Sequence, residues 1–239
     1  MPAHEEFAGL GDPVYARVRE RIRADILSGY FKPGVRIKTA TLGTRYGVSQ
    51  MPIREALQSL QGEGLVTLAP NRGASVRSID AQFIGNIYDI RIALETMLVR
   101  RAIRFLTDAD MFALYSAESR FEEAVQKRDV ERTLETNHDL HTTMYRLARN
   151  TEATDVLARH SELIQSLRRR YGYSQSRTVE LIAEHRQLLR AFEQRDAEAA
   201  AQASEKHIEH ARADLLAQAG LSEESAPQDT GLRQPAAGK

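Results

Sequence analysis

Along the first third of the chain, the hydrophobic positions change period quickly, and this predicts several short elements. A spacing of four residues predicts an amphipathic helix that opens at Asp12-Pro13 and ends at Ser28-Gly29. The apolar positions of that helix are Val14, Val18, Ile22 and Ile26. A second, short helix is expected from about Ala40 to Tyr46, with Gly47 as its terminator.

A third helix and a hairpin follow directly. Ser49 stands at the N-cap position, and Pro52 falls in the first turn, where its missing N–H has no intrahelical partner. One apolar stripe runs along this helix through Ile53, Ala56, Leu57 and Leu60. Alternation over residues 65–69 leads into Pro70–Gly73, which has the composition of a hairpin tip, and then into Ala74 and Val76. Residues 13–77 are therefore predicted to form a winged helix-turn-helix domain.

Residues 81–218 have a different pattern. They are rich in Ala, Leu, Glu and Arg, and neither Gly nor Pro occurs between Gly85 and Gly172. We therefore expect long helices with short polar joints, forming an all-α antiparallel bundle over residues 85–218. Residues 78–84 are the expected linker, 1–12 a flexible N-terminus, and 219–239 a polar, disordered tail. The predicted fold class is mainly α.

Composition narrows the class of protein. The 239 residues are 42% hydrophobic and 28% charged, as in an ordinary globular protein, and there is no Cys for a disulfide or a thiolate nucleophile. No signal peptide and no apolar run of roughly 18 residues is present, so a cytoplasmic protein without membrane spans is expected. Net charge is zero, yet residues 13–77 hold eleven Lys/Arg and four acids, which leaves +7 there and −7 elsewhere. The basic block favours a polyanion-binding module over a chance fluctuation on a solvated surface.

The third helix carries candidate DNA-reading chemistry. The second helix of a helix-turn-helix enters the major groove N-terminus first, so its opening residues face base edges and phosphates. Gln50 can pair with adenine and Arg54 with guanine, while Ser49 can cap the helix or bond a phosphate. Arg72, at the hairpin tip, can reach a phosphate or a narrow minor groove. The alternative for Arg54 is a solvated ion pair with Glu55 or another neighbour.

Three histidines and one asparagine form a candidate metal site in the second part. Asn137 and His141 are four residues apart and share a helix face, while His185 and His207 are placed near the inward faces of two later helices. Imidazoles suit Zn, Ni, Cu or Fe, so these four side chains could converge on one divalent cation. Each His could instead be exposed or bonded to a carbonyl. His138 and His210 are plausible substitutes, because the helix phase is uncertain by about a residue.

The N-terminal motifs resemble those of GntR-type transcriptional regulators. The stretches are ILSGYFKPGVRI, YGVSQMPIREALQSLQGEGLV and PNRGASV, and the resemblance covers about residues 13–77. The usual family core reads approximately GVSRTPVREAL, so Gln50 replaces an Arg and Met51 a Thr, which puts the family's usual operator in doubt. The predicted DNA-contacting residues are Arg45, Ser49, Gln50, Met51, Arg54, Arg72 and Gly73.

The later motifs are similar to the FadR-type C-terminal domain, called FCD. They read IRIALE, NHDLH, LARN, EHRQLLRAF and HIEH, over about residues 85–215. The resemblance implies an all-α ligand sensor with a metal, Zn or Ni, held by Asp/Asn-x3-His and two later His. The matching positions are Asn137, His141, His185 and His207. Arg91 matches the Arg of R-x-x-LE, and is expected to bind the carboxylate of a small organic-acid effector or else to pair with Glu95.

These patterns together predict a homodimeric, effector-responsive transcription factor, a repressor of a metabolic operon, and not an enzyme. Two recognition helices would engage the half-sites of a pseudo-palindromic operator in double-stranded DNA. One alternative is a metal-dependent, hydrolase-like enzyme, against which stand the lack of an HExxH-like carboxylate and the position of Glu184, expected on another face than His185. The other alternative is a DNA-binding protein with a purely structural bundle.

Overall fold

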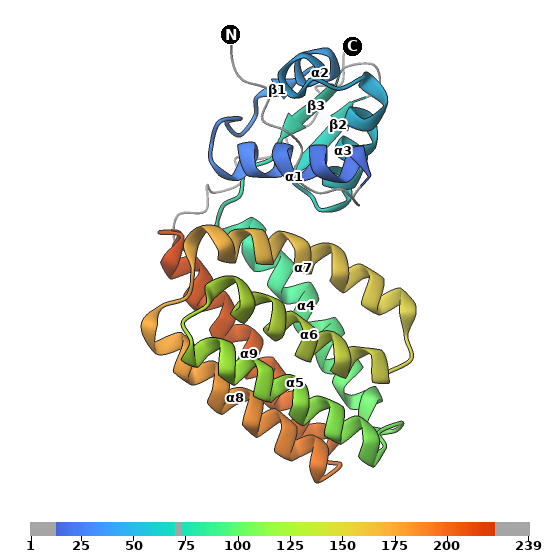
Figure 1. Ribbon diagram of the computed structural model, residues 1–239, viewed down its shortest axis with the longest axis vertical. Helices are drawn as coiled ribbons and strands as arrows, with labels where there is room; N and C mark the ends of the chain where they lie inside the picture. The colour runs from blue at the N-terminus through green and yellow to red at the C-terminus, as the bar shows by residue number, and fades with distance from the viewer. Residues whose placement is uncertain (1–12, 70–72, 223–239) are drawn as a thin grey trace, which may run out of the picture. The chain divides into compact units, whose positions relative to one another are not determined.

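The computed structural model describes residues 13–69 and 73–222, which form two compact units (Figure 1). The winged unit contains the residues up to Ile79 together with Glu152–Arg170. The helical unit contains Asp80–Thr151 and the residues from Tyr171 onward. Helices dominate both, and the one described sheet has three strands, so the predicted mainly-α class is confirmed.

The winged unit follows the predicted order over residues 13–77, with one additional strand, and it also includes residues 152–170, which were predicted as part of the bundle. Its elements are α1 (Val14–Leu27), β1 (Arg36–Ile37), α2 (Thr39–Tyr46), α3 (Gln50–Gly62), β2 (Val66–Ala69), β3 (Gly73–Val76) and α7 (Thr151–Tyr171). The sheet order is β1-β3-β2, with both pairs antiparallel. Ser75 lies opposite Arg36 on one side and Thr67 on the other. The strand β1 was not predicted, because two residues are too few to show an alternating pattern.

Glycine backbone geometry explains two turns of this unit. Gly47 ends α2 in the left-handed conformation, with φ of 67°, as its predicted role as a terminator requires. Gly73 opens β3 with φ of +80°, and a Cβ there would lie 2.4 Å from the Ile37 carbonyl oxygen. A side chain at position 73 is therefore excluded by both the backbone conformation and the close approach of β1.

The start of α1 needs correction, whereas α3 starts where it was predicted but without the side-chain cap. Pro13 occupies the N-cap position of α1, one residue before the helix, and its predicted capping partner Asp12 lies outside the described residues. Ser49 is at the N-cap of α3 with an extended backbone, but its side chain makes no capping hydrogen bond. Ser49 is exposed, and the first backbone N–H groups of α3 have no side-chain cap.

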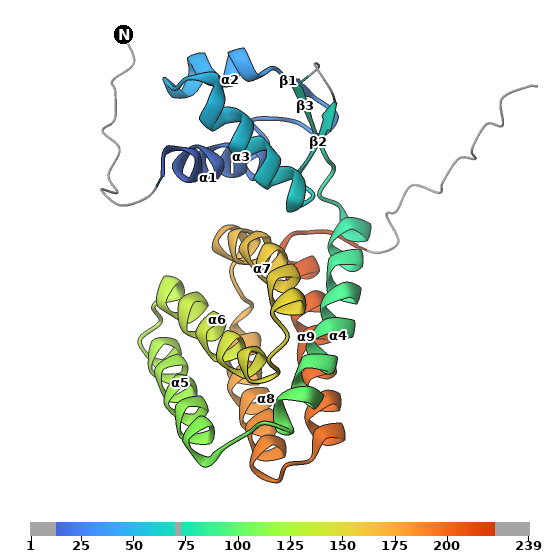
Figure 2. The same ribbon diagram turned by 90° about the vertical axis from the view of Figure 1, so that its right-hand side faces the viewer.

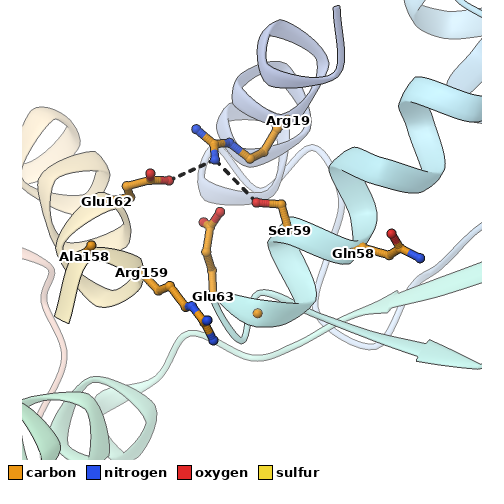
Figure 3. Close-up of a pocket in the computed structure, with 8 residues that line it drawn as sticks. Arg19, Gln58, Ser59, Glu63, Ala158, Arg159 and Glu162 are labelled. Carbon is orange, nitrogen blue, oxygen red and sulfur yellow. Dashed lines mark hydrogen bonds and ion pairs between the residues drawn. The ribbon is translucent and has the colours of Figure 1, made fainter. Parts of the chain in front are cut away.

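A buried ion cluster ties α1 to α3 and α7. Arg23 donates to Glu63 from Nε at 2.9 Å and from Nη2 at 2.7 Å, and both side chains are almost fully buried. Arg23 also pairs with Glu20 and, at 3.0 Å, with Glu162 of α7. Figure 3 shows Arg19 beside this cluster, directed at Glu162 and Ser59 at the edge of a cavity of about 320 Å³. Removing one member of such a buried group leaves its partner without charge compensation.

The helical unit is built from five helices. They are α4 (Ala81–Ile103), α5 (Asp108–Gln126), α6 (Val130–Leu147), α8 (Gln175–Glu193) and α9 (Ala197–Gln218). Helix α4 packs along α9 and α6, and α5 lies between α6 and α8, as Figure 2 shows. Residues 81–84, predicted as linker, are the first turn of α4, capped by the Asp80 carboxylate, which accepts from the Phe83 N–H. No described helix is long and apolar enough to cross a membrane.

The joints between the long helices use arginine where glycine is usual. Residues in the left-handed conformation follow α5, α6 and α8, with φ of 52–55°: Arg128, Arg149 and Arg195. The carboxylates of Asp129 and Asp196 then accept hydrogen bonds from the first turns of α6 and α9. A helix can therefore stop and restart within two or three residues without Gly or Pro.

Candidate metal centre and nucleic-acid interface

The N-terminus of α3 presents the residues predicted to read DNA. Gln50, Met51 and Arg54 are all exposed on its first turns. No hydrogen bond or ion pair joins Arg54 to another described residue, so the alternative of a pair with Glu55 is not what the structure shows. Because the stripe Ile53, Ala56, Leu57 and Leu60 is buried, the opposite face is left for a partner.

The other predicted DNA-contacting residues differ in what holds them. Arg45 donates to Asp25 at 2.8 Å, and its guanidinium lies 3.8 Å from the centre of the Tyr30 ring. Its side chain stays about one-third exposed, so Asp25 and Tyr30 hold the Arg45 side chain in place without burying it. Gly73 is explained by its contact with β1, and its predicted DNA contact stays a prediction. Arg72 lies outside the described residues.

The three predicted histidine ligands come together in the core of the helical unit. His141 of α6, His185 of α8 and His207 of α9 are all buried, and their rings lie 4.9–5.2 Å apart between centres. One nitrogen from each ring falls within 4.8 Å of the other two. The substitutes His138 and His210 are not in this cluster: His138 bonds Thr142, and His210 is exposed. The structure therefore settles the helix phase that the sequence left open.

Each ring is held through its Nδ1 atom, which leaves Nε2 for the centre. His185 Nδ1 is 2.9 Å from Glu118 Oε2, and His207 Nδ1 is 2.8 Å from Glu184 Oε2. The Tyr145 hydroxyl donates to Glu95 and, at 3.1 Å, accepts from His141 Nδ1. Such partners fix the tautomer of a metal-ligating histidine and orient its ring.

Two polar atoms of the predicted ligand residues have no protein partner. The Nε2 atom of His185 and the Oδ1 atom of Asn137 are both buried and make no hydrogen bond to a described residue. Buried polar atoms of this kind call for a partner, because desolvation without a hydrogen bond is unfavourable by about 1–3 kcal/mol. The lone pairs of imidazole nitrogen and amide oxygen can both coordinate a divalent cation, so the residues present fit a metal.

The electrostatics of the centre favour neutral, ligand-ready imidazoles. Burial, reinforced by the neighbouring histidines, holds the pKa of His141 and of His185 well below the ordinary histidine value. Burial also lowers the pKa of His207, although Glu184 opposes this. All three rings are therefore uncharged at neutral pH, the protonation state that metal coordination requires.

The two supporting carboxylates differ in their own surroundings. Glu184 accepts both terminal guanidinium nitrogens of Arg177, at 2.7 and 2.8 Å, and also bonds His210. Glu118 has no hydrogen bond besides that to His185, and its Oε1 is buried without a described partner. Burial, with the nearby Glu122, raises the pKa of Glu118 to about 8.

Arg91 lies on the same network. Its Nε donates to Glu95 at 2.7 Å, and its guanidinium is 5.2 Å from the centre of the Tyr88 ring. The pairing with Glu95, one of the two predicted alternatives, is therefore present. Because Glu95 is almost fully buried, this is not a weak surface pair. The Nη atoms of Arg91 make no hydrogen bond to a described residue.

Sequence reasoning missed the residues behind the histidines. Glu184 was expected to face away from His185, and it does, but it meets His207 instead. Glu118 and Tyr145 were not considered. A signal for Glu118 does exist: it falls on the buried stripe of α5, among Leu114, Ala117 and Phe121. A carboxylate at a core position needs a buried partner, and His185 is that partner.

Comparison with known proteins agrees with this architecture. The family model described as bacterial regulatory proteins, gntR family, matches residues 14–76, and the FCD domain model matches residues 86–210. The HTH-type transcriptional regulator YdhC of Bacillus subtilis is 28% identical over 200 residues, which cover 83% of this chain and 89% of YdhC. The HTH-type transcriptional repressor RspR of Escherichia coli is 24% identical over 197 residues, or 82% and 86% of the two chains. The solved structure of E. coli McbR/YncC shares the fold, with a TM-score of 0.65 at 22% identity over 87% of this chain and all of that one.

Proposed function

Since the chain belongs to the gntR family of bacterial regulatory proteins and carries an FCD domain, it is a DNA-binding transcriptional regulator, and we propose that it represses a metabolic operon in response to a small carboxylate. The similarity to RspR, which is named a transcriptional repressor, supports the sign of regulation. The protein acts in the cytoplasm, where its operator lies. The observation that carries the sensor role is the buried cluster of three neutral imidazoles, whose ligand nitrogens lie within 4.8 Å of one another.

Recognition of the operator starts from α3. Arg54 reads guanine and Gln50 reads adenine in the major groove, while the unbonded Ser49 hydroxyl and the helix N–H groups bind phosphate. A homodimer presents two such helices to the half-sites of a pseudo-palindromic operator. Arg45, Met51, Arg72 and Gly73 complete the proposed contact surface. Bidentate base pairs contribute discrimination of about 1–3 kcal/mol each.

The helical unit holds Zn or Ni through Asn137, His141, His185 and His207. Support comes from the buried, unpartnered Asn137 Oδ1 and His185 Nε2, and from the three Nδ1 atoms that other side chains already hold. When bound, the metal supplies a Lewis-acidic centre that can accept a carboxylate oxygen. The protein's own residues orient the ligands and exclude water; no catalytic role is assigned to them.

The effector is proposed to contact Arg91. Its Nε is committed to Glu95, but the two Nη atoms are not, and a guanidinium fork suits a carboxylate. Effector binding regulates DNA affinity only if it favours one arrangement of the DNA-binding domains over another. A coupling of about 1–3 kcal/mol changes DNA affinity by about 5–150-fold.

Metal content of purified variants tests the sensor role. We expect His185→Ala to lose bound metal by elemental analysis, whereas His138→Ala, the neighbouring position outside the cluster, retains it. Thermal melts with Zn²⁺, Ni²⁺ and a panel of small carboxylates identify stabilising ligands, each of which is then added to an operator titration. Unchanged metal content in His185→Ala contradicts the ligand set. Turnover of a stabilising carboxylate would instead favour the metal-dependent enzyme.

A further inference from the structure

The proposed metal ligands are uncharged, so the carboxylates that hydrogen-bond to the histidines are of interest. Three neutral imidazoles and one amide oxygen bring no negative charge to a divalent cation. The only carboxylates that hold a histidine of this cluster directly, among the described residues, are Glu118 and Glu184. Their role therefore bears on how tightly and how selectively the centre binds metal.

The two carboxylates are not equivalent. Glu184 is shared among His207, His210 and the buried Arg177, so its charge is already balanced and its position is fixed three times over. Glu118 bonds His185 alone. The nearest cation, Arg186, donates both of its hydrogen bonds to Glu122, at 2.7 and 2.8 Å.

The orientation and the tautomer of the His185 ring in turn depend on Glu118. His185 is fully buried, and Glu118 Oε2 is its one hydrogen-bond partner among the described residues. When Nδ1–H donates to this oxygen, the Nε2 lone pair is free and the ring plane is fixed. Without the bond, either tautomer is available, and one of them carries a proton on the atom that faces the cluster.

We infer that Glu118 is the positioning residue of the metal centre: by accepting from His185 Nδ1–H, it orients the ring and selects the His185 tautomer that binds metal. This inference rests on the proposed metal site. Partners of this kind, when mutated, reduce metal affinity by about 10–100-fold. The carboxylate reaches the ring from α5, which provides no proposed ligand, so α5 is a fourth helix at the centre beside α6, α8 and α9.

Two substitutions separate charge from geometry. Glu118→Gln keeps an acceptor oxygen for Nδ1–H but removes the charge, and Glu118→Ala removes both. The matched control is Glu123→Gln on the same helix, which removes an exposed carboxylate that pairs with Lys127 and touches no histidine. The full-length protein is stripped with a chelator, and Zn²⁺ affinity is measured by competition with a chromophoric chelator. Co²⁺ absorption in the visible range reports the ligand field of the bound ion.

We expect Zn²⁺ affinity to fall about tenfold in Glu118→Gln and up to about 100-fold in Glu118→Ala, with an altered Co²⁺ spectrum and no change in Glu123→Gln. Melting of the metal-free proteins shows that each variant is folded, and a purely structural role for Glu118 would lower these melting temperatures without changing the Co²⁺ spectrum. Equal affinity and identical spectra in wild type and both Glu118 variants would overturn the inference while leaving the metal site intact. No metal uptake by the wild type would instead overturn the proposed function.

Discussion

The effect of Asn137→Ala on stability is predicted to change sign when metal is bound. In the described structure its Oδ1 atom is buried and has no protein partner. A buried acceptor of this kind lowers stability by about 1–3 kcal/mol, and Asn is a poorer helix former than Ala by up to about 0.7 kcal/mol. Some packing is lost when the amide is removed. We therefore expect metal-free Asn137→Ala to be as stable as the wild type or more stable, by roughly 1–2 kcal/mol.

With zinc present, the order should reverse. A ligand at 100 times its dissociation constant stabilises the folded state by about 2.7 kcal/mol. If the loss of Asn137 weakens binding 100-fold, the variant gains only about 0.4 kcal/mol at the same zinc concentration, since ln 2 replaces ln 101 in that expression. In zinc, the wild type should then be the more stable protein. The difference in unfolding free energy equals the difference between the two zinc-induced gains, minus the extra stability that the variant has without metal.

Thermal melts with chelator and with zinc measure the stability difference between Asn137→Ala and wild type in the two states. About 1 kcal/mol corresponds to about 2–4 °C in melting temperature for chains of 150–250 residues. Because the chain has two compact units, hydrogen exchange of α6 amides follows the relevant unit directly. Asn86→Ala is the control: this Asn is exposed on α4 and reports helix propensity alone. A metal-free Asn137→Ala that is less stable than wild type by over about 1 kcal/mol, or an equal gain from zinc in both proteins, would refute the reasoning.

Three further changes test the DNA-binding surface and the backbone. Arg54→Ala should weaken operator binding by about 1–3 kcal/mol and relax base preference; an unchanged affinity at fixed salt would remove its reading role. Gly73→Ala should destabilise the sheet by about 1–3 kcal/mol, because the new Cβ meets the Ile37 carbonyl; normal exchange protection of β1 and β3 amides would contradict this. Arg128→Gly should raise the stability of the helical unit by about 1 kcal/mol, because φ of 55° suits Gly better, whereas Lys127→Gly, in the right-handed conformation, should lower it.

The elements predicted from sequence are those whose signal is local. The period of four in α1 and the buried stripe of α3 could be recognised from sequence because one face of each helix packs inward. The strand β1 could not, because its two residues are strands only through pairing with β3, some 38 residues away. The joint after α5 has no Gly or Pro; Arg128 takes the left-handed conformation and Asp129 caps the next helix.

The residues of the site likewise fall into two groups: those that a local sequence pattern indicates, and those that only tertiary packing reveals. His185 and His207 could be placed near inward faces from their apolar neighbours, but only the structure shows that His141 and His207, and not His138 and His210, join the cluster. The supporting carboxylates could not be paired with their histidines, because Glu118 and His185 are 67 positions apart on different helices. Only the tertiary packing of α5 against α8 brings those two together.

Helix α7 connects the winged unit to the proposed sensor along the chain. Residues 152–170 lie inside the FCD match, yet they cluster with the winged unit, where Glu162 pairs with Arg19 and Arg23. Arg23 in turn holds Glu63, directly after the last residue of α3. In the sequence, α7 directly connects α6 and α8, which carry His141 and His185. A ligand that changes the position of these helices therefore acts on a segment covalently joined to the ion cluster under α3. Thermodynamic linkage then requires operator DNA to change effector affinity by the same factor as the effector changes DNA affinity, and calorimetry with and without operator measures it.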